Sequence, residues 1–332
     1  MAAVAQNPCG SAPSLEQRGV ISPHPLIRGE AMRISLKNVL LSTDFSSASD
    51  AALPYPVEIA KQFEAKLYVV HVVFPELYEA LPKGAAQSAM VQAKQHAEQR
   101  MQQLLSSSPL TGVQHEGMVR VGEIWDQLAG VIQECNVDLV ATGTHGRRGA
   151  KKMLLGSVAE EIFRLSPVPV LTVGPAVSVS FPHELRSVLH PTDFSAHSGQ
   201  AAEYALSLAQ QFQSCLTWLH VVQQPGPDPS NRTRLRTFFC ERLRELLPAE
   251  ASNWCQPQYR VEFGDPVENI VRIAGQSKTD LIVMGVWGAG ALARATTHAG
   301  NVAYRVVAES TAPVLTVRGS SFERPDLNVY ES

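Results

Sequence analysis

The chain has 332 residues, 45% of them hydrophobic and 18% charged, and its formal net charge is −3. This length and composition predict two globular domains of about 150 residues, each with its own core. The weak net charge argues against a chain-wide surface for nucleic acid or anionic membranes, so any anion site must be local.

The sequence shows no segment that would carry the protein into or across a membrane. No apolar run approaches the ~18 residues of a membrane span, and the N-terminal segment lacks the charged start and apolar core of a signal peptide. We therefore expect a cytoplasmic protein with no membrane partner. The five cysteines form no CxxC pair and no zinc-ligand spacing, which predicts reduced thiols and no metal site.

The first segment, residues 1–35, is rich in Ala, Ser, Pro and Gly and has no sustained period, so we predict a disordered leader. Met32 lies just before the first expected strand. Translation therefore starts at either Met1 or Met32, and the intact mass of the native protein distinguishes the two.

From Lys37 onwards, apolar strands alternate with helical segments. Pro54 and Pro56 should disturb the early turns of the first helix, which Ser46 or Ser47 would cap. We expect strands at Lys37–Leu41, Lys66–Val73, Val113–Val121, Val137–Thr142 and Val168–Val173, and helices at Ser47–Phe63, Ala85–Leu105 and Glu123–Glu134, with a further helix opening at Gly156-Ser157.

This alternation predicts parallel βαβ units with right-handed crossovers in an open, doubly wound α/β sheet, with ligands at the carboxyl edge of the strands. Asp44 and Gly143 both leave strands at that edge. If the first and fourth strands are neighbours at the topological switch point, these two residues face one crevice.

A glycine-rich basic loop joins the fourth expected strand to the next helix. Gly143 and Gly146 form a GxxG pattern, and Gly156-Ser157 enters the helix. Glycine permits close backbone approach to a ligand, and a helix start offers unpaired N–H groups and the positive end of a dipole. We expect Ser157 to cap the helix or to donate its hydroxyl to a phosphate. Between the glycines lie cationic donors for phosphate oxygens: Arg147, Arg148, Lys151 and Lys152.

The order of strand, glycine loop, cations and Gly-Ser pair favours phosphate binding. The alternative is that the glycines only form tight turns and that the cations make up a solvated face. The loop is not one of the common phosphate-binding loops, because neither GxxxxGK[ST] nor a GxGxxG opening a βαβ unit occurs in the chain.

The pattern then repeats. A shift of 149 residues places SVLHPTDFS (187–195) on NVLLSTDFS (38–46), and residues 300–317 match residues 156–173. This internal duplication predicts a leader at 1–35, a first domain at 36–175, a linker at 176–184, a second domain at 185–319 and a C-terminal tail at 320–332.

The second copy departs from the first in its loop. Eleven residues rather than nine separate Gly288 from Gly300, Asn301 replaces the serine, and one cation, Arg294, remains. We expect a much weaker attraction for a triphosphate and a mainly structural second domain. Weak nucleotide binding through the retained Asp193 is the alternative.

The spacing of the glycines and Ser157 resembles the ATP-binding signature of the universal stress protein family. The resemblance extends to TDFS (43–46) and HVV (71–73), and it runs as two copies from about residue 37 to residue 317. It implies that Asp44 contacts the adenosine moiety and that the backbone of Val72 bonds to adenine. The nucleotide-binding residues that it implies are Thr43, Asp44, Val72, Thr142, Gly143, Gly146, Gly156, Ser157 and Val158, to which charge adds Arg147 and Arg148.

The residues alone leave two alternatives open within this set. An aspartate that follows a strand and precedes a helix is often a local backbone cap. Asp44 could therefore have this structural role alone. Val72 is equally well explained as a core residue of its strand.

The resemblance implies a tandem member of this family that binds ATP, with or without Mg²⁺, in the first domain. Occupancy would act as a regulatory signal to a client protein of unknown identity. Pairing through the last strands, Val168–Val173 and Val314–Val317, would form inside the chain, and further homodimerisation stays open. The rivals are a slow ATPase or adenylyl-transferring enzyme and an interaction module without nucleotide. We assign no catalytic residue, because no carboxylate near the loop stands out.

Overall fold

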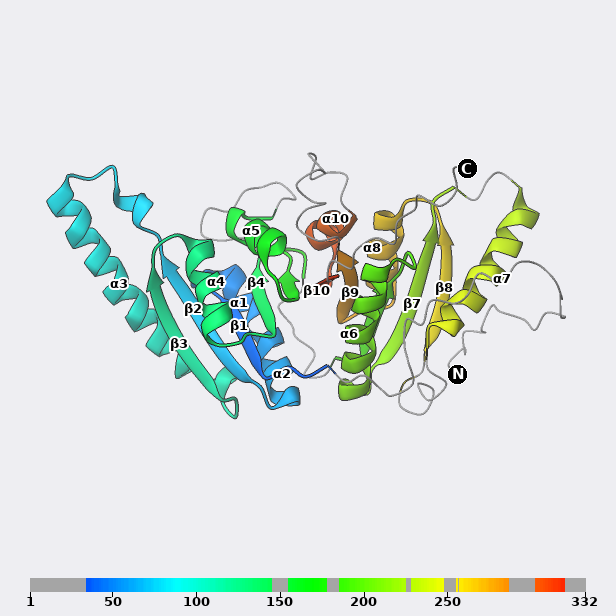
Figure 1. Cartoon of the computed structure of the whole chain (residues 1–332), viewed down its shortest axis with the longest axis horizontal. Helices are drawn as coiled ribbons and strands as arrows, with labels where there is room; N and C mark the ends of the chain where they lie inside the picture. The colour runs from blue at the N-terminus through cyan, green and yellow to red at the C-terminus, as the bar shows by residue number, and fades with distance from the viewer. Residues whose placement is uncertain are drawn as a thin grey trace, which may run out of the picture.

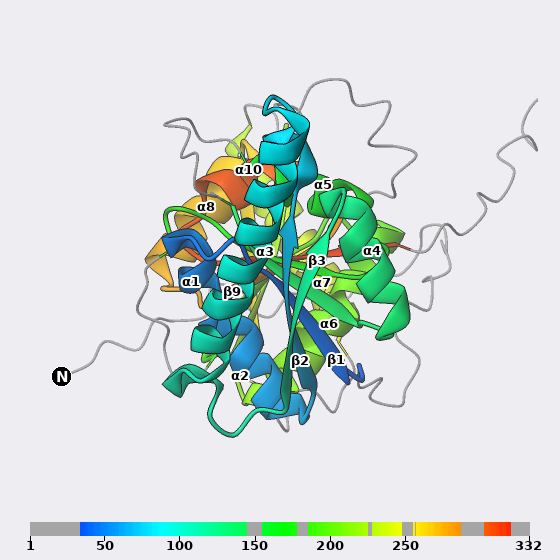
Figure 2. The same cartoon turned by 90° about the vertical axis from the view of Figure 1, so that its left-hand side faces the viewer.

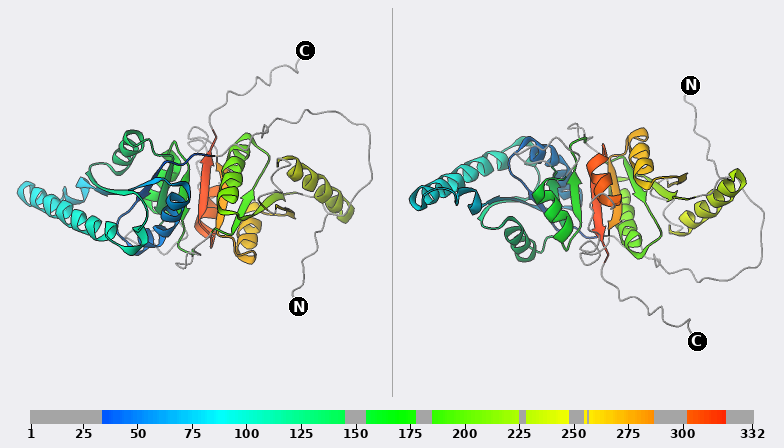
Figure 3. Two further views of the ribbon diagram at one scale, coloured as in Figure 1. Left: turned by 90° about the horizontal axis from the view of Figure 1, so that it is seen from below. Right: turned by 90° about the horizontal axis from the view of Figure 1, so that it is seen from above.

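The computed structural model describes residues 34–144, 155–177, 185–224, 228–247, 255, 257–286 and 302–319. Within these ranges the chain forms a ten-stranded sheet in the order β3-β2-β1-β4-β5-β10-β9-β6-β7-β8. Helices cover both faces of this sheet along its whole width (Figure 1 and Figure 3). The predicted α/β class and the tandem arrangement of two doubly wound units are confirmed, and the two units share one continuous sheet.

The first domain contributes five parallel strands. Val39 and Leu41 of the first strand enter one buried cluster and Leu40 enters another, because successive side chains of a strand point to opposite faces. The strands are β1 (Asn38–Ser42), β2 (Lys66–Val73), β3 (His115–Val121), β4 (Leu139–Gly143) and β5 (Val170–Val173).

Five helices and two 3₁₀ turns connect these strands. The long α3 and the shorter α4 lie on opposite faces of β2 and β3 (Figure 2). The helices are α1 (Ser47–Ala52), α2 (Pro54–Phe63), α3 (Lys83–Leu105), α4 (Ile124–Glu134) and α5 (Ser157–Leu165), and the 3₁₀ turns are η1 (Pro75–Tyr78) and η2 (Ser108–Leu110).

The second domain repeats this arrangement. Its strands are β6 (Ser187–Pro191), β7 (Cys215–Val222), β8 (Gln258–Phe263), β9 (Leu281–Val286) and β10 (Val314–Arg318). Its helices are α6 (Ala196–Phe212), α7 (Pro229–Glu245), α8 (Pro266–Gln276) and α10 (Val302–Glu309).

The expectation of one helix over Ser47–Phe63 is wrong. The helix ends at Ala52 and a new one begins at Pro54, because proline has no N–H to continue the helical ladder but fits the first position of a helix. The matching segment of the second domain has Glu203 in place of this proline and forms the single helix α6.

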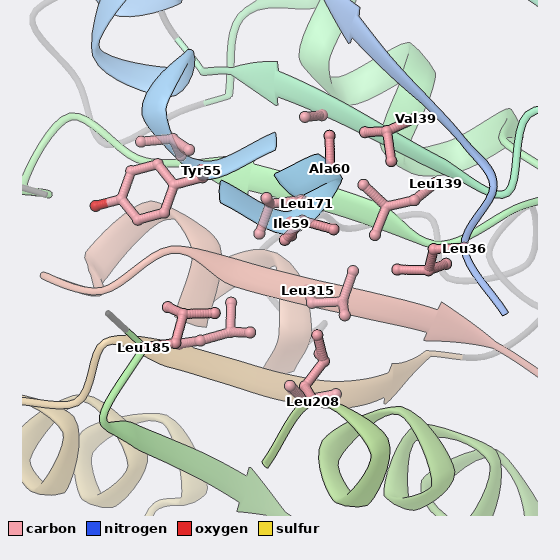
Figure 4. Close-up of a cluster of buried hydrophobic side chains, with 14 of the residues drawn as sticks. Leu36, Val39, Tyr55, Ile59, Ala60, Leu139, Leu171, Leu185, Leu208 and Leu315 are labelled. Atoms are coloured by element: carbon pink, nitrogen blue, oxygen red, sulfur yellow. The ribbon is translucent and has the colours of Figure 1, made fainter. Parts of the chain in front are cut away.

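The two domains join through their last strands. β5 and β10 pair in antiparallel fashion, with Leu171 opposite Leu315, whereas the other strand pairs of the described sheet are parallel. Leu171, Leu315 and Ile59 also belong to one buried cluster that crosses the junction (Figure 4). The internal pairing that the resemblance implied is therefore present.

A pair of glutamines shows that the junction is close to twofold symmetric. The side-chain amide of Gln62 donates to the backbone oxygen of Gln211 at 2.7 Å, and that of Gln211 donates to the backbone oxygen of Gln62 at 2.7 Å, across a separation of 149 residues. This separation equals the shift that aligns the two copies.

We expect Gln62→Ala and Gln211→Ala each to lower the free energy of unfolding by about 0.5–1.5 kcal/mol, the usual net value of one hydrogen bond. The two losses should be equal within error, because the bonds are symmetric. Urea denaturation measures both, with Gln133→Ala on exposed α4 surface as the control. A loss confined to one of the two variants would contradict the symmetry.

Candidate functional site

The predicted switch point lies between β1 and β4. β1 is flanked by β2 on one side and by β4 on the other, with Ser42 opposite Val70 and Thr142. Both strands of the β1–β4 pair end at the same edge because they are parallel. Asp44 follows β1 and Gly143 is the last residue of β4. Both therefore lie at the same carboxyl edge, as predicted.

The segment after β1 is a tight turn that uses Asp44 as a backbone cap. One carboxylate oxygen of Asp44 accepts from the Ser46 amide at 3.0 Å and from the Ser49 hydroxyl at 2.6 Å. Phe45 has a φ of 57°, a left-handed conformation that the Thr43 hydroxyl supports by accepting from the Phe45 amide at 3.0 Å. Ser46 caps α1. The capping role of Asp44 is thus present.

The end of β2 packs against this turn. Nδ1 of His71 lies 2.7 Å from the backbone oxygen of Thr43, and because a carbonyl only accepts, this nitrogen carries the proton. The His71 and Phe45 rings lie 4.6 Å apart. Arg100 of α3 donates to the backbone oxygen of Phe45 at 2.9 Å. Val72, the predicted adenine contact, is half-buried, and its side chain packs against a different buried cluster from that of Phe45.

Gly143 at the end of β4 allows a close backbone contact. A Cβ at this position would lie 2.7 Å from the backbone oxygen of Ala48 in α1. Gly285 at the end of β9 meets the backbone of His197 in the same way. Because both copies need glycine here for packing, Gly143 by itself is no evidence for phosphate binding.

The start of α5 lies against the end of β4. The Thr144 amide donates to Val173 at 3.1 Å, and the Gly156 amide donates to the backbone oxygen of Thr144 at 2.6 Å. Gly156 is the N-cap and makes no side-chain capping bond. Of the two roles predicted for Ser157, that of helix cap is wrong, since Gly156 is the N-cap and Ser157 is the first helical residue. Its contact with a phosphate stays a prediction. Its side chain is exposed and therefore accessible to a ligand.

The structure brings seven of the predicted residues to this edge, with Val72 on the adjacent strand. Thr43 and Thr142 have buried side chains, and Val158 is half-buried. The seven are Thr43, Asp44, Thr142, Gly143, Gly156, Ser157 and Val158. Gly146, Arg147 and Arg148 lie outside the described residues, as do Lys151 and Lys152.

The second domain repeats the turn. Oδ1 of Asp193 accepts from the Ser195 amide at 3.0 Å and from the Ser198 hydroxyl at 2.8 Å. Burial alone would raise the pKa of Asp193, but the hydrogen bonds from Ser195 and Ser198 outweigh it and leave the pKa below its ordinary value. Nδ1 of His220 lies 2.8 Å from the backbone oxygen of Thr192. Both copies thus keep the same turn.

The two turns differ in what covers them. An arginine lies over the phenylalanine ring of each turn, Arg100 over Phe45 and Arg242 over Phe194. In the second domain the Phe239 ring of α7 also covers the turn, 4.3 Å from His220 and 5.9 Å from Phe194. A cavity beside the second turn has about 10 Å³ of free space, room for about one water molecule. It is lined by Thr192, Phe194, Ser195, Ser198, Gly199, Ala202 and Leu246.

Arg100 and Phe239 were not predicted. Both come from long helices that carry no motif, and the sequence offers no signal that they reach the strand ends. The comparison with the second loop stays a prediction, because Gly288, Arg294 and the flanking residues 287–301 lie outside the described residues.

The described residues limit two other classes of site. They contain no group of three or more His, Cys, Asp and Glu side chains placed to bind a metal ion. The described helices are also all too short or too polar to span a membrane.

The chain is similar to known proteins over nearly its whole described length. The model of the universal stress protein family matches residues 35–174 and 184–318. A universal stress protein of Methanocaldococcus jannaschii is 28% identical over 138 residues, which cover 41% of this chain and 81% of that protein. Each such relative therefore corresponds to about one domain.

One solved structure that covers most of this chain shows the same fold. The crystal structure of a universal stress protein from Archaeoglobus fulgidus is 22% identical, covers 85% of this chain and 98% of that chain, and has a TM-score of 0.63. A universal stress protein solved in complex with cAMP is 26% identical and covers 42% of this chain and 98% of that chain, with a TM-score of 0.29. The two matches to the family model together span most of this chain, which therefore belongs to the universal stress protein family as a tandem of two such domains.

Proposed function

We propose that the first domain binds an adenine nucleotide, with ATP as the best fit, between the Asp44 turn and the start of α5. The observation that carries this proposal is the 2.6 Å bond from the Gly156 amide to Thr144, which brings an N-terminus without a side-chain cap to the end of β4. A helix N-terminus offers free amides and a positive dipole end to a phosphate.

In this proposal the two ends of the nucleotide meet different parts of the edge. Asp44 and the Val72 backbone receive the adenosine moiety, and the amides of Ser157 and Val158 with the Ser157 hydroxyl receive phosphate oxygens. The loop residues Gly146, Arg147 and Arg148 supply further donors. An accompanying Mg²⁺ would be bound mainly by phosphate oxygens and water, as is usual for this ion.

The nucleotide would act as a regulatory signal rather than as a substrate. Its occupancy would change the surface that a client protein meets. The second domain would serve mainly as the structural partner of the first in a cytoplasmic protein. Phe239 covers His220 at the strand end of the second domain, which supports a mainly structural role for that domain.

The test is a thermal-shift titration of the full chain with ATP, ADP, AMP and cyclic AMP. We expect ATP to stabilise the protein by about 1.4 kcal/mol at a tenfold excess over Kd, following RT ln(1 + [L]/Kd). Asp44→Asn should abolish most of this stabilisation. Asp193→Asn is the matched control, because Asp193 makes the same capping bonds in the second domain.

Both substitutions should lower the stability of the free protein by similar amounts, since both weaken the same cap. Only the first should reduce the response to nucleotide. Absence of any shift with the four nucleotides would contradict the proposal. An equal loss in both variants would contradict the assignment of the site to the first domain.

A further inference from the structure

The second domain reaches the start of α5. In Figure 1, α10 of the second domain lies beside α5 of the first, above the junction of β5 and β10. The rings of Phe163 and Tyr304 meet edge to face with centroids 6.3 Å apart. Leu155 and Phe163 belong to the same buried cluster as Tyr304 and Val307. The beginning of α5 is therefore packed on the second domain.

The buried Tyr304 also touches the backbone of this segment. Burial raises the pKa of Tyr304, the charge of Glu160 raises it further, and a hydrogen bond with the backbone of Leu155 lowers it. A hydrogen bond that lowers the pKa of a phenol stabilises the phenolate, so the Leu155 amide is the donor and the Tyr304 oxygen the acceptor. The side chain is 6% exposed, so water competes little for this bond.

This bond lies directly before the proposed phosphate contacts. Leu155 precedes Gly156 and Ser157, and the Gly156 amide already donates to Thr144 at 2.6 Å. The segment that enters α5 is thus bound on both sides, by β4 of its own domain and by α10 of the other. Two anchors on adjacent residues restrict the directions in which the following amides point.

The duplication is not symmetric at this position. The match of residues 156–173 with residues 300–317 places Glu160 where the second copy has Tyr304. At this position the first domain therefore has a carboxyl in place of the hydroxyl that meets Leu155.

We propose that Tyr304 is a positioning residue that the second domain supplies to the nucleotide site of the first. Its oxygen fixes the Leu155 amide, and through it the orientation of the Gly156 and Ser157 amides toward a phosphate. This inference rests on the proposed nucleotide site. It also gives the second domain a specific part in binding at the first.

The test is Tyr304→Phe in the full chain, which removes the hydroxyl but keeps the ring that packs on Phe163. We expect the affinity for ATP, measured by calorimetry, to fall about three- to tenfold, the usual effect of one lost hydrogen bond. Hydrogen exchange of the ligand-free protein should become faster at residues 155–158. Tyr259→Phe on β8 is the control, because it removes a half-buried hydroxyl far from α5, and it should change neither quantity.

The outcomes separate the two proposals. Wild-type protein that binds ATP, with Tyr304→Phe equal to it in affinity, overturns the role of Tyr304 and leaves the proposed function intact. Weaker ATP binding by Tyr304→Phe without faster hydrogen exchange at residues 155–158 also overturns the role of Tyr304, since the hydroxyl would then not act by orienting these amides. Wild-type protein that binds none of the four nucleotides overturns the proposed function and this inference together.

Discussion

Replacing Gly143 with alanine is expected to destabilise the protein by about 1–3 kcal/mol, the usual cost of overpacking a buried contact. The new Cβ would lie 2.7 Å from the oxygen and 2.9 Å from the carbon of the Ala48 carbonyl. Both are backbone atoms, so no side-chain rotation can relieve the clash and α1 must shift. Urea denaturation of the full chain measures the loss.

The shift should also reach the proposed site. Ser49 of α1 donates to Asp44 at 2.6 Å, so movement of α1 disturbs the orientation of that carboxylate. We therefore expect Gly143→Ala to weaken the nucleotide response as well as the fold. Both effects would come from packing, with no change in any residue that contacts a phosphate through its side chain.

Gly130→Ala is the matched control for this substitution. Gly130 lies within α4, and a Cβ there would meet nothing closer than the Glu134 carboxylate at 3.7 Å. We expect this variant to gain up to about 1 kcal/mol, because alanine is the better helix former. Equal stability of Gly143→Ala and the wild type would show that α1 is not restrained against β4.

A second large effect is expected when the pH falls from about 6.5 to about 4. His190 of β6 is fully buried, and its Nδ1 lies 2.8 Å from the backbone oxygen of Val283. Its Nε2 has no hydrogen-bond partner among the described residues, and neither has Nε1 of Trp218, whose ring lies 4.8 Å away. The charged form of His190 therefore has no compensation in the core.

Burial accordingly lowers the pKa of His190 from 6.5 to about 4, against smaller raising effects of the Val283 bond and the Asp193 charge. The unfolded chain takes up this proton near pH 6.5, whereas the folded protein takes it up only near pH 4. The contribution is thus fully present above pH 6.5 and is lost as the pH falls toward 4. The loss is on the order of 3 kcal/mol.

Chemical denaturation at a series of pH values tests this expectation. His190→Leu should remove this part of the pH dependence, and leucine fits the position because Leu41 occupies it in the first domain. His96→Leu, at an exposed site on α3, is the control and should leave the pH dependence unchanged. Parallel curves for the wild type and His190→Leu below pH 6.5 would contradict the argument.

The sequence predicted the elements that depend on local patterns. The strand expected at Lys66–Val73 has those bounds in the structure, because a continuous apolar run between polar segments identifies a buried parallel strand. The repeated pattern of the chain predicted the duplication. The alternation of strands and helices predicted that Asp44 and Gly143 lie at the same carboxyl edge of the sheet. The break of the first helix at Pro54 was predicted only as a disturbance of early turns.

Contacts between residues distant in the chain were not predictable in the same way. Gly143 and Ala48, Arg100 and Phe45, or Phe239 and His220 are separated by long stretches and leave no period in the sequence. The capping prediction for Ser157 failed for a related reason. The bond from the Gly156 amide to Thr144 sets where α5 begins, and that bond depends on how the chain returns to β4.

The amino-acid sequence by itself determined two domains of one family, their parallel strands and the edge at which Asp44 and Gly143 meet, because periodicity, glycine spacing and repetition are properties of the chain order. Only the tertiary structure decided that β5 and β10 join the two sheets with Leu171 opposite Leu315, and that Tyr304 of one domain reaches Leu155 of the other. Strand register and side-chain reach depend on the packing of both domains at once, which no local stretch of sequence encodes.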